Sequence, residues 1–361
     1  MSGRSLRGWR GRCRLALACR SRAPRSSGSA TRVRQPLPLC DSTPESKLTC
    51  RTPTPDNFAG TDAAPEGGYQ AVTDALAAKA EADGAVFRLG ETITGVSEAD
   101  GGVTVQTSSS DSSKQRQTYT ARTAVCTIPL GVLKTLPSSF FSPALKPRKT
   151  RAVESTHVGE LAKVVLTYPS VWWPAKTGSF TVLPSSSPLS AAEAKKASAA
   201  ELLASIPLVV SSFASGALPK THPTLLTYVA SPISALIEAL PSADVAAALH
   251  ATLALKIPIA AAAGADSSSA PEPSHAVVTT WSADPFSLGA TSTPNTTGPH
   301  RSPLDFLELS RAEWAGRLGF AGEHTDVNHR GSVTGACVSG EREATRVAGL
   351  LERLKVREAS T

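Results

Sequence analysis

The segment from Phe320 to Ala344 constrains the fold more than any other part of the chain. It begins with the apolar Phe320-Ala321, continues through the polar Gly322-Glu323-His324-Thr325, and resumes at Gly331-Ser332-Val333 with small residues. This order predicts a short strand, a polar loop and a helix that follows a glycine. The start of such a helix presents unpaired N–H groups and a partial positive charge. It can therefore stabilise an electron-rich group. The alternative is a plain capped helix that packs on a sheet, with Gly335 allowing the helix and the sheet to approach closely.

The length and apolar content of the chain allow two ordinary domains or one large one. Its 361 residues are 41% apolar, which is enough for a substantial core, although only 5% are aromatic. The sequence has no run of about 18 or more apolar residues, so it predicts no transmembrane helix.

The positive charge of the chain belongs to its first part. The formal net charge is +7, but residues 1–40 hold ten Arg and no acidic residue, which leaves 27 basic and 30 acidic residues beyond them. Residues 1–55 lack hydrophobic periodicity and are predicted to be a disordered basic arm. Such an arm can bind nucleic acid or an anionic membrane, or it can serve as a mitochondrial transit peptide. A further interpretation is that residues 1–50 are not natural coding sequence. We expect an intracellular protein in which any nucleic-acid binding is confined to this arm.

The cysteines predict neither a disulfide framework nor a metal site. None has the C-x-x-C spacing of a zinc ligand pair, and four lie in the basic arm. The chain also lacks the H-E-x-x-H and G-x-S-x-G patterns, so no metalloprotease or serine hydrolase is indicated. We interpret the cysteines as reduced thiols and expect no metal. They are Cys13, Cys19, Cys40, Cys50, Cys126 and Cys337.

Hydrophobic periodicity and turn residues predict a chain of mixed strands and helices. Pro241 is expected to interrupt one long helix, and Arg342, Arg346 and Arg353 are expected to face outward from the last one. Glu341 and Glu343 are interpreted as part of a solvated helix start. Helices are predicted over 69–82, 130–136, 231–256 and 338–354, and strands over 86–89, 92–96, 103–106, 119–128, 164–168, 225–229 and 277–281, with mostly loop over 284–312.

Four blocks of sequence occur in a distinctive order. They are Gly67-Gly68-Tyr69 with the later Arg88-Leu89 and Ile93; Ala124 to Leu133, which ends in Pro129-Leu130-Gly131-Val132-Leu133; Ala162-Lys163-Val164-Val165-Leu166, followed by Trp172-Trp173-Pro174; and Trp281 to Pro285, leading through Gly289 to the Gly-Glu-His-Thr segment. In this order the blocks, which span about residues 67–352, resemble the FAD-dependent amine oxidases. That family includes polyamine oxidases, monoamine oxidases and lysine-specific histone demethylases.

The resemblance implies roles for particular residues. The backbone matching Ser332 and Val333 lies against the flavin, the carboxylate matching Glu323 binds the cofactor, and the residue matching Ile93 contacts the adenine side of FAD. The lysine matching Lys163 holds a water near flavin N5 and assists reoxidation by oxygen, which makes it the candidate catalytic residue. From the residues alone, a solvent-facing strand lysine and an ordinary core isoleucine are the alternatives.

The resemblance fails at two places. The family begins with a βαβ unit whose G-x-G-x-x-G turn holds the FAD pyrophosphate, and this pattern is absent from the chain. We therefore expect an N-terminally incomplete member that exposes apolar edges. The family also often flanks the amine with two aromatic rings, whereas the matching substrate-pocket positions here are Thr291 and Ser332.

These observations predict an α/β protein with a two-domain flavin amine oxidase-like fold. A partial FAD-binding domain is expected over 67–135 and 314–355. A mixed-sheet substrate domain is expected over 150–310, with insertions near 183–201 and 259–274. The implied reaction removes hydride from the C–H next to an amine nitrogen of a polyamine or related amine, with FAD as cofactor and oxygen as acceptor. The alternative is a non-catalytic remnant, a binding module or a fragment of such an enzyme.

Overall fold

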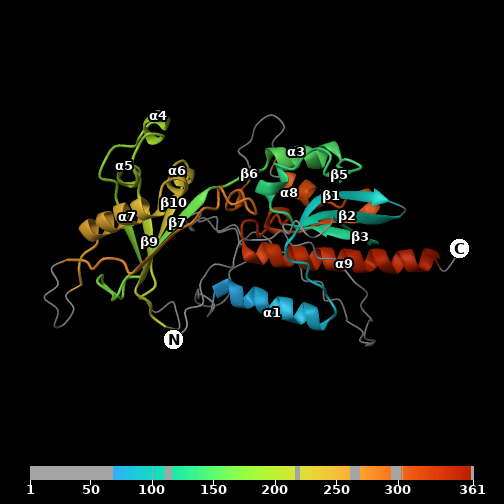
Figure 1. The fold of residues 1–361 in the computed structure, drawn as a ribbon, viewed down its shortest axis with the longest axis horizontal. Helices are drawn as coiled ribbons and strands as arrows, with labels where there is room; N and C mark the ends of the chain where they lie inside the picture. Colours follow the sequence, from blue (N-terminus) through green and yellow to red (C-terminus); the bar gives the residue numbers. More distant parts are fainter. Residues whose placement is uncertain are drawn as a thin grey trace, which may run out of the picture.

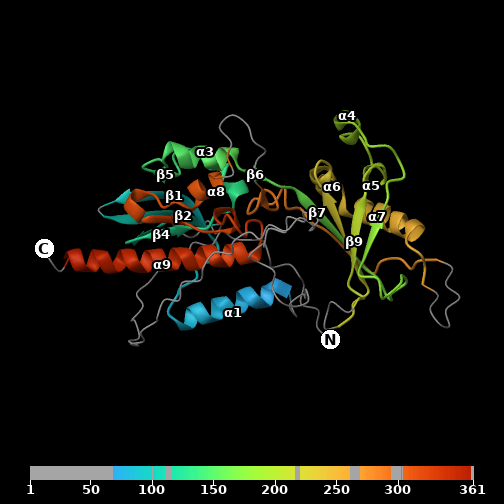
Figure 2. The same ribbon diagram turned by 180° about the vertical axis from the view of Figure 1, so that it is seen from behind.

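The computed structural model of the chain describes residues 68–99, 101–109, 116–215, 220–260, 269–293, 302 and 304–358. The basic arm expected over 1–55 lies outside these residues, as does part of the loop expected over 259–274. Figures 1 and 2 show one group of strands and helices at each end of the long axis of the molecule, joined through the segment that contains β6 and β7. The α/β class expected from the sequence is confirmed.

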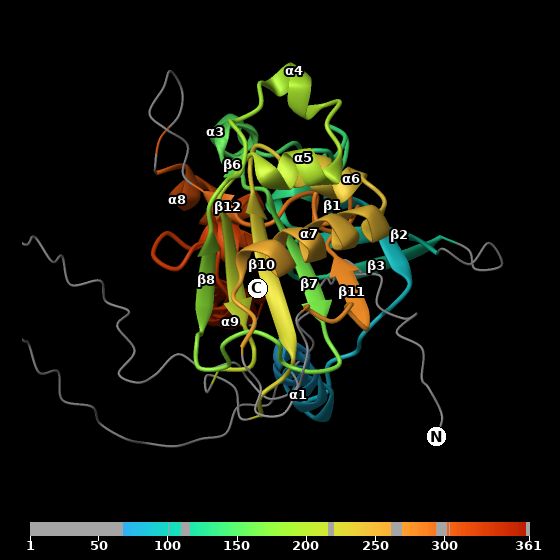
Figure 3. The same ribbon diagram turned by 90° about the vertical axis from the view of Figure 1, so that its left-hand side faces the viewer.

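One end of the molecule is a five-stranded sheet in the order β11-β7-β10-β9-β8. All of its pairings are antiparallel. Helices α5, α6 and α7 cover one face of this sheet, as Figure 3 shows. The strands are β7 (Leu161–Thr167), β8 (Ser179–Val182), β9 (Leu208–Ser212), β10 (Thr224–Ala230) and β11 (His275–Val278).

The alternation of side chains along β7 determines which of its residues face the helices and which face away from them. Ala162, Val164 and Leu166 are fully buried and belong to the core under the helices. Because successive side chains of a strand point to opposite faces, Lys163 and Val165 lie on the other face. The strand therefore carries a lysine away from the helix-covered core and toward the middle of the molecule.

The helices of this part follow local sequence signals. The region expected as an insertion near 183–201 contains α4 (Ala191–Ala194) and the start of α5 (Ala199–Ala204), each opened by a Ser and Glu capping box. Pro241 separates α6 (Ser234–Ala239) from α7 (Ser242–Lys256), so the predicted interruption of the long helix is confirmed.

The other end of the molecule contains a four-stranded sheet in the order β3-β2-β1-β5. Its pairings are antiparallel except for the parallel pair of β1 with β5. A mixed sheet was expected over 150–310, but the five-stranded sheet of that region is antiparallel, and the mixed sheet is this one. Gly101 adopts a φ of 75° in the predicted hairpin turn, a conformation that glycine tolerates. The strands are β1 (Glu91–Ala99), β2 (Gly102–Ser109), β3 (Gln117–Ala121) and β5 (Phe141–Ser142).

A short parallel pair lies beside this sheet and leads into the region that the sequence singled out. Strand β13 (Leu318–Phe320) pairs with β4 (Ala124–Cys126), and both share a core with the four-stranded sheet. Helices α3 and α8 pack against each other next to the pair. Further elements are α2 (Leu130–Leu133), α3 (Pro147–Ser155), β6 (His157–Val158), β12 (Ser292–Thr293), α8 (Asp305–Ser310), α9 (Val333–Glu358) and the short 3-10 helices η1 (Trp314–Gly316) and η2 (Glu323–Thr325).

Two sequence-based strand predictions were wrong. Residues 86–89 form no strand, because no neighbouring strand pairs with them, and Val86 and Leu89 are exposed. The strand predicted over 119–128 is two strands, β3 and β4, which belong to different sheets. The described residues of 284–312 are mostly loop, as expected, with the short β12 and α8, whose Phe306 and Leu309 are buried against Leu130 and Ala152.

Helix α1 (Gly68–Ala82) forms where periodicity predicted it, yet it has no buried residue. Tyr69, Val72 and Leu76, apolar residues at helical spacing, are all exposed. In Figures 1 and 2, α1 lies beneath α9, apart from the two groups of strands and helices. An apolar stripe on a helix normally packs against another element, and among the described residues none covers this one.

Candidate functional site

A cavity of about 330 Å³ opens where the two ends of the molecule meet. Its walls come from segments that are far apart in the sequence: the β4–α2 turn, β6 and β7, the turn after β11, and the loop after β13. The lining residues are Thr127, Pro129, Leu130, Gly131, Val158, Lys163, Trp281, Ser287, Gly289, Ala290, Thr291, Ser292, Gly322, Glu323 and His324.

Lys163 forms one wall of this cavity. Its side chain is half-buried, and Nζ donates a hydrogen bond to the Leu161 carbonyl at 3.0 Å. Nζ also lies 6.0 Å from the centroid of the Trp281 ring, at the edge of cation–π range. Burial lowers the pKa of Lys163, and the Glu238 carboxylate opposes this by favouring the charged form. The cavity thus has a cationic wall beside an indole.

Glu323 also lines the cavity and is held at both carboxylate oxygens. Oε1 accepts a hydrogen bond from the Ser292 hydroxyl at 2.7 Å, and Oε2 accepts one from the Gly331 N–H at 2.6 Å. Next to this contact, Thr291 lines the cavity, and its carbonyl accepts from the Gly159 N–H. The three segments 291–292, 323 and 331 therefore meet at one point.

The start of α9 has the form that the sequence predicted. Gly331 has a φ of 72°, and the Ser332 hydroxyl accepts a hydrogen bond from the Gly335 N–H at 3.1 Å. A Cβ at Gly335 would collide with the His329 carbonyl, which explains the small residue there. Ser332 and Val333 are exposed at the helix start and do not line the cavity. Ile93 also lies away from the cavity, partly buried against the core of the four-stranded sheet.

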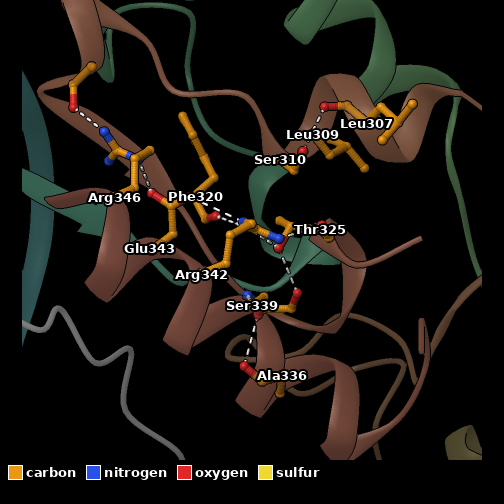
Figure 4. Close-up of polar contacts among 12 residues, drawn as sticks. Leu307, Leu309, Ser310, Phe320, Thr325, Ala336, Ser339, Arg342, Glu343 and Arg346 are labelled. Carbon is orange, nitrogen blue, oxygen red and sulfur yellow. Dashed lines mark hydrogen bonds and ion pairs between the residues drawn. The ribbon is translucent and has the colours of Figure 1, made fainter. Parts of the chain in front are cut away.

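Arg342 anchors the loop that carries Glu323 (Figure 4). Its guanidinium donates hydrogen bonds to the Phe320 carbonyl at 2.6 Å and to the Thr325 carbonyl at 2.9 Å, so it bridges both ends of the loop. The prediction that Arg342 and Arg346 face outward was wrong, as was the solvated placement of Glu343. All three turn inward, because both guanidinium groups pair with the buried Glu343 carboxylate and also donate hydrogen bonds to backbone carbonyls.

Two further titratable groups lie behind the same loop. His324 is almost fully buried, and burial, with help from the nearby cations Lys149 and Arg342, lowers its pKa to about 4. Lys149 is also buried; its Nζ donates to the carbonyls of Glu308 and Leu309 and lies 3.9 Å from the centroid of the Phe320 ring. Burial lowers the pKa of Lys149 to about 8. Neutral His324 thus forms part of the cavity wall at physiological pH.

Sequence reasoning brought Lys163, Glu323 and Thr291 together through the resemblance alone, and the structure places all three around one cavity. It missed His324, Lys149 and Arg342. The signal that could have indicated Lys149 is the lone basic residue on the buried face of an otherwise polar helix. Within the ranges that the structure describes, no helix is long and apolar enough to cross a membrane, and no group of three or more His, Cys, Asp or Glu could hold a metal ion.

Comparison with known proteins agrees with this arrangement. Residues 22–348 match the family model described as flavin containing amine oxidoreductase, which begins earlier than the residue 67 expected from the sequence blocks. The chain is 28% identical over 307 residues to "Possible lysine-specific histone demethylase 1" of Drosophila melanogaster, covering 81% of this chain and 31% of that protein. It is 30% identical over 277 residues to "Lysine-specific histone demethylase 1 homolog 2" of Arabidopsis thaliana, covering 76% and 32%.

The fold is also similar to that of a solved enzyme. Cyclohexylamine oxidase from Brevibacterium oxydans superposes with a TM-score of 0.50 at 18% identity, over 72% of this chain and 48% of that one. The chain spans about a third of the length of the curated relatives named above. Because the family model matches most of the chain, from residue 22 to residue 348, the chain belongs to the flavin-containing amine oxidoreductase family.

Proposed function

We propose that this chain, when it carries FAD, oxidises the C–H bond next to the nitrogen of a polyamine or related amine, with oxygen as acceptor. The observation that carries the proposal is that Lys163, Trp281, Thr291 and Glu323, drawn from separate segments, line one cavity. In this reaction the substrate loses a hydride and forms an imine, water hydrolyses the imine, and oxygen takes up the two electrons to give hydrogen peroxide.

The residues present fit one half of the cofactor. FAD supplies the hydride acceptor when it is bound. Glu323 and the N–H groups at the start of α9 offer a hydrogen-bonding carboxylate and a partial positive charge, which suit the polar edge of a flavin. Lys163, which lines the same cavity as Glu323, would add a positive charge. In the described ranges, no glycine-rich turn between a strand and a helix is available for the pyrophosphate.

The cavity offers an amine substrate fewer aromatic contacts than a site with two aromatic rings would. Trp281 is the aromatic residue in the lining, and it already lies beside Lys163. Thr291 occupies one of the two positions where the family often has a ring. A missing ring removes a cation–π contact worth about 0.5–2 kcal/mol. We therefore propose low activity on simple amines.

We expect the isolated chain to bind FAD with a dissociation constant above the micromolar range. A pyrophosphate site contributes several charged hydrogen bonds, each worth about 1.5–3 kcal/mol. Titration of the purified chain with FAD, followed by flavin fluorescence, measures the affinity. Release of peroxide from a panel of polyamines at saturating FAD tests the oxidase function. Submicromolar binding would contradict the first expectation, and absence of peroxide at saturation would favour a non-catalytic binding module.

In the FAD-loaded chain, Lys163→Met is expected to slow reoxidation by oxygen more than reduction by amine. A positive charge beside the reacting centre stabilises the anionic species formed as oxygen is reduced, whereas loss of hydride from the amine has no such requirement. Stopped-flow absorbance of the two half-reactions measures each rate. Lys176→Met, on an exposed turn, is the matched control. Equal slowing of both half-reactions by Lys163→Met would place the lysine in a structural role.

A further inference from the structure

Glu238 is a buried carboxylate that lies just behind the cavity and is not among its lining residues. It occupies the last turn of α6, and only 8% of its surface is exposed. A carboxylate in such a place must be satisfied by donors, because burying an unpaired charge is costly. Its donors come from the segment that follows β11, the edge strand of the five-stranded sheet.

Three groups of that segment donate to the two oxygens of Glu238. Oε1 accepts from the Thr279 hydroxyl at 2.9 Å and from the Trp281 N–H at 3.0 Å. Oε2 accepts from the Ser282 N–H at 2.8 Å. Hydrogen bonds to an ionised acceptor are about twice as strong as neutral ones. Glu238 thus binds the backbone at the point where β11 turns into the cavity wall.

The residues that donate to Glu238 also form hydrogen bonds with the backbone of Lys163 and with the turn that begins at Trp281. The Trp281 carbonyl accepts from the Gly289 N–H at 2.9 Å and from the Ser287 hydroxyl at 3.0 Å, which closes the turn from 281 to 289. The Thr279 hydroxyl accepts from the Lys163 N–H at 2.9 Å, and the Thr279 N–H donates to the Lys163 carbonyl at 3.0 Å.

We propose that Glu238 is a positioning residue of the cavity: through Thr279, Trp281 and Ser282 it holds the Lys163 backbone and the turn from 281 to 289 in one fixed relation. Four cavity-lining residues belong to this clamp, namely Lys163, Trp281, Ser287 and Gly289. The negative charge of Glu238 acts on the same wall, because it favours the charged form of Lys163 against the effect of burial. This proposal rests on the proposed function in one respect, because it takes the cavity to be the site of the reaction.

The test uses the full chain without flavin, so its outcome is independent of cofactor binding and activity. Selective ¹⁵N labelling of the five Trp residues reports hydrogen exchange of the Trp281 amide, with Trp281→Phe assigning the signal. In Glu238→Ala and Glu238→Gln we expect this amide to exchange at least tenfold faster than in the wild type. The Trp173 indole N–H, which is buried and donates to the Ser212 hydroxyl at 2.8 Å, serves as an internal reference, because global destabilisation would accelerate both.

A second measurement separates the charge of Glu238 from its hydrogen bonds. The pH titration of Lys163, followed in ¹³C-lysine-labelled chain and assigned with Lys163→Arg, is expected to move to lower pH in Glu238→Gln. Thr279→Val removes a hydroxyl but keeps the carboxylate, so it should leave this titration in place. Glu352→Gln, which removes an exposed carboxylate from α9, is the charge-matched control. An unchanged Trp281 exchange rate in both Glu238 variants, or an unchanged Lys163 titration in Glu238→Gln, would overturn the proposal.

Discussion

Replacement of Glu343 by Ala is expected to lower the free energy of unfolding by about 3–5 kcal/mol, the usual cost of breaking a buried ion pair. The Glu343 side chain is only 3% exposed and pairs with Arg342 Nε at 3.3 Å and with Arg346 Nε at 2.7 Å. Without the carboxylate, two guanidinium groups remain side by side with no compensating charge. Urea unfolding of both proteins gives the difference.

The consequence reaches the cavity, because Arg342 is the group that ties the loop ends at Phe320 and Thr325 (Figure 4). Glu352→Ala, on the same helix but paired with Lys355 at the surface, is the matched control and should cost less than about 1 kcal/mol. If Glu343→Ala cost no more than this control, the cluster would have to be solvated like any surface pair.

The stability of the wild type relative to Lys149→Met is expected to increase with pH above about 8. Burial lowers the pKa of Lys149 from 10.5 to about 8. Between these two values the unfolded chain keeps the proton that the folded chain has lost. Since the unfolded state then binds more protons, the free energy of unfolding rises with pH, by roughly 3 kcal/mol in total. The Met variant lacks this contribution.

Urea unfolding of the two proteins at several values between pH 7 and pH 10 measures the effect as a difference between proteins. Taking that difference removes the contribution of every other titrating group. Lys355→Met, at an exposed position of α9, controls for the general loss of a lysine. A constant difference across the range would show that folded Lys149 keeps its proton, and hence that its contacts with the Glu308 and Leu309 carbonyls favour the ammonium form.

The sequence determined those features that depend on neighbours along the chain. Pro241 ends α6 because proline cannot continue a helix, and Gly101 turns the hairpin between β1 and β2 because glycine tolerates positive φ. The strand, loop and helix around Glu323 were predicted for the same reason. The order of the four blocks indicated the family, since each block is short but their order is specific.

The tertiary structure decided the environment of each charged side chain, which depends on segments distant in the sequence. Helical periodicity placed Arg342 and Glu343 at the surface, but loop carbonyls and a second arginine draw them inward. Residues 86–89 have the composition of a strand and form none, because a strand needs a partner to accept its hydrogen bonds. The cavity wall likewise depends on a glutamate 75 residues beyond Lys163 in the chain, held by the turn after β11. Local propensity determines elements, whereas the pairing of buried polar groups determines which of them meet to form a site.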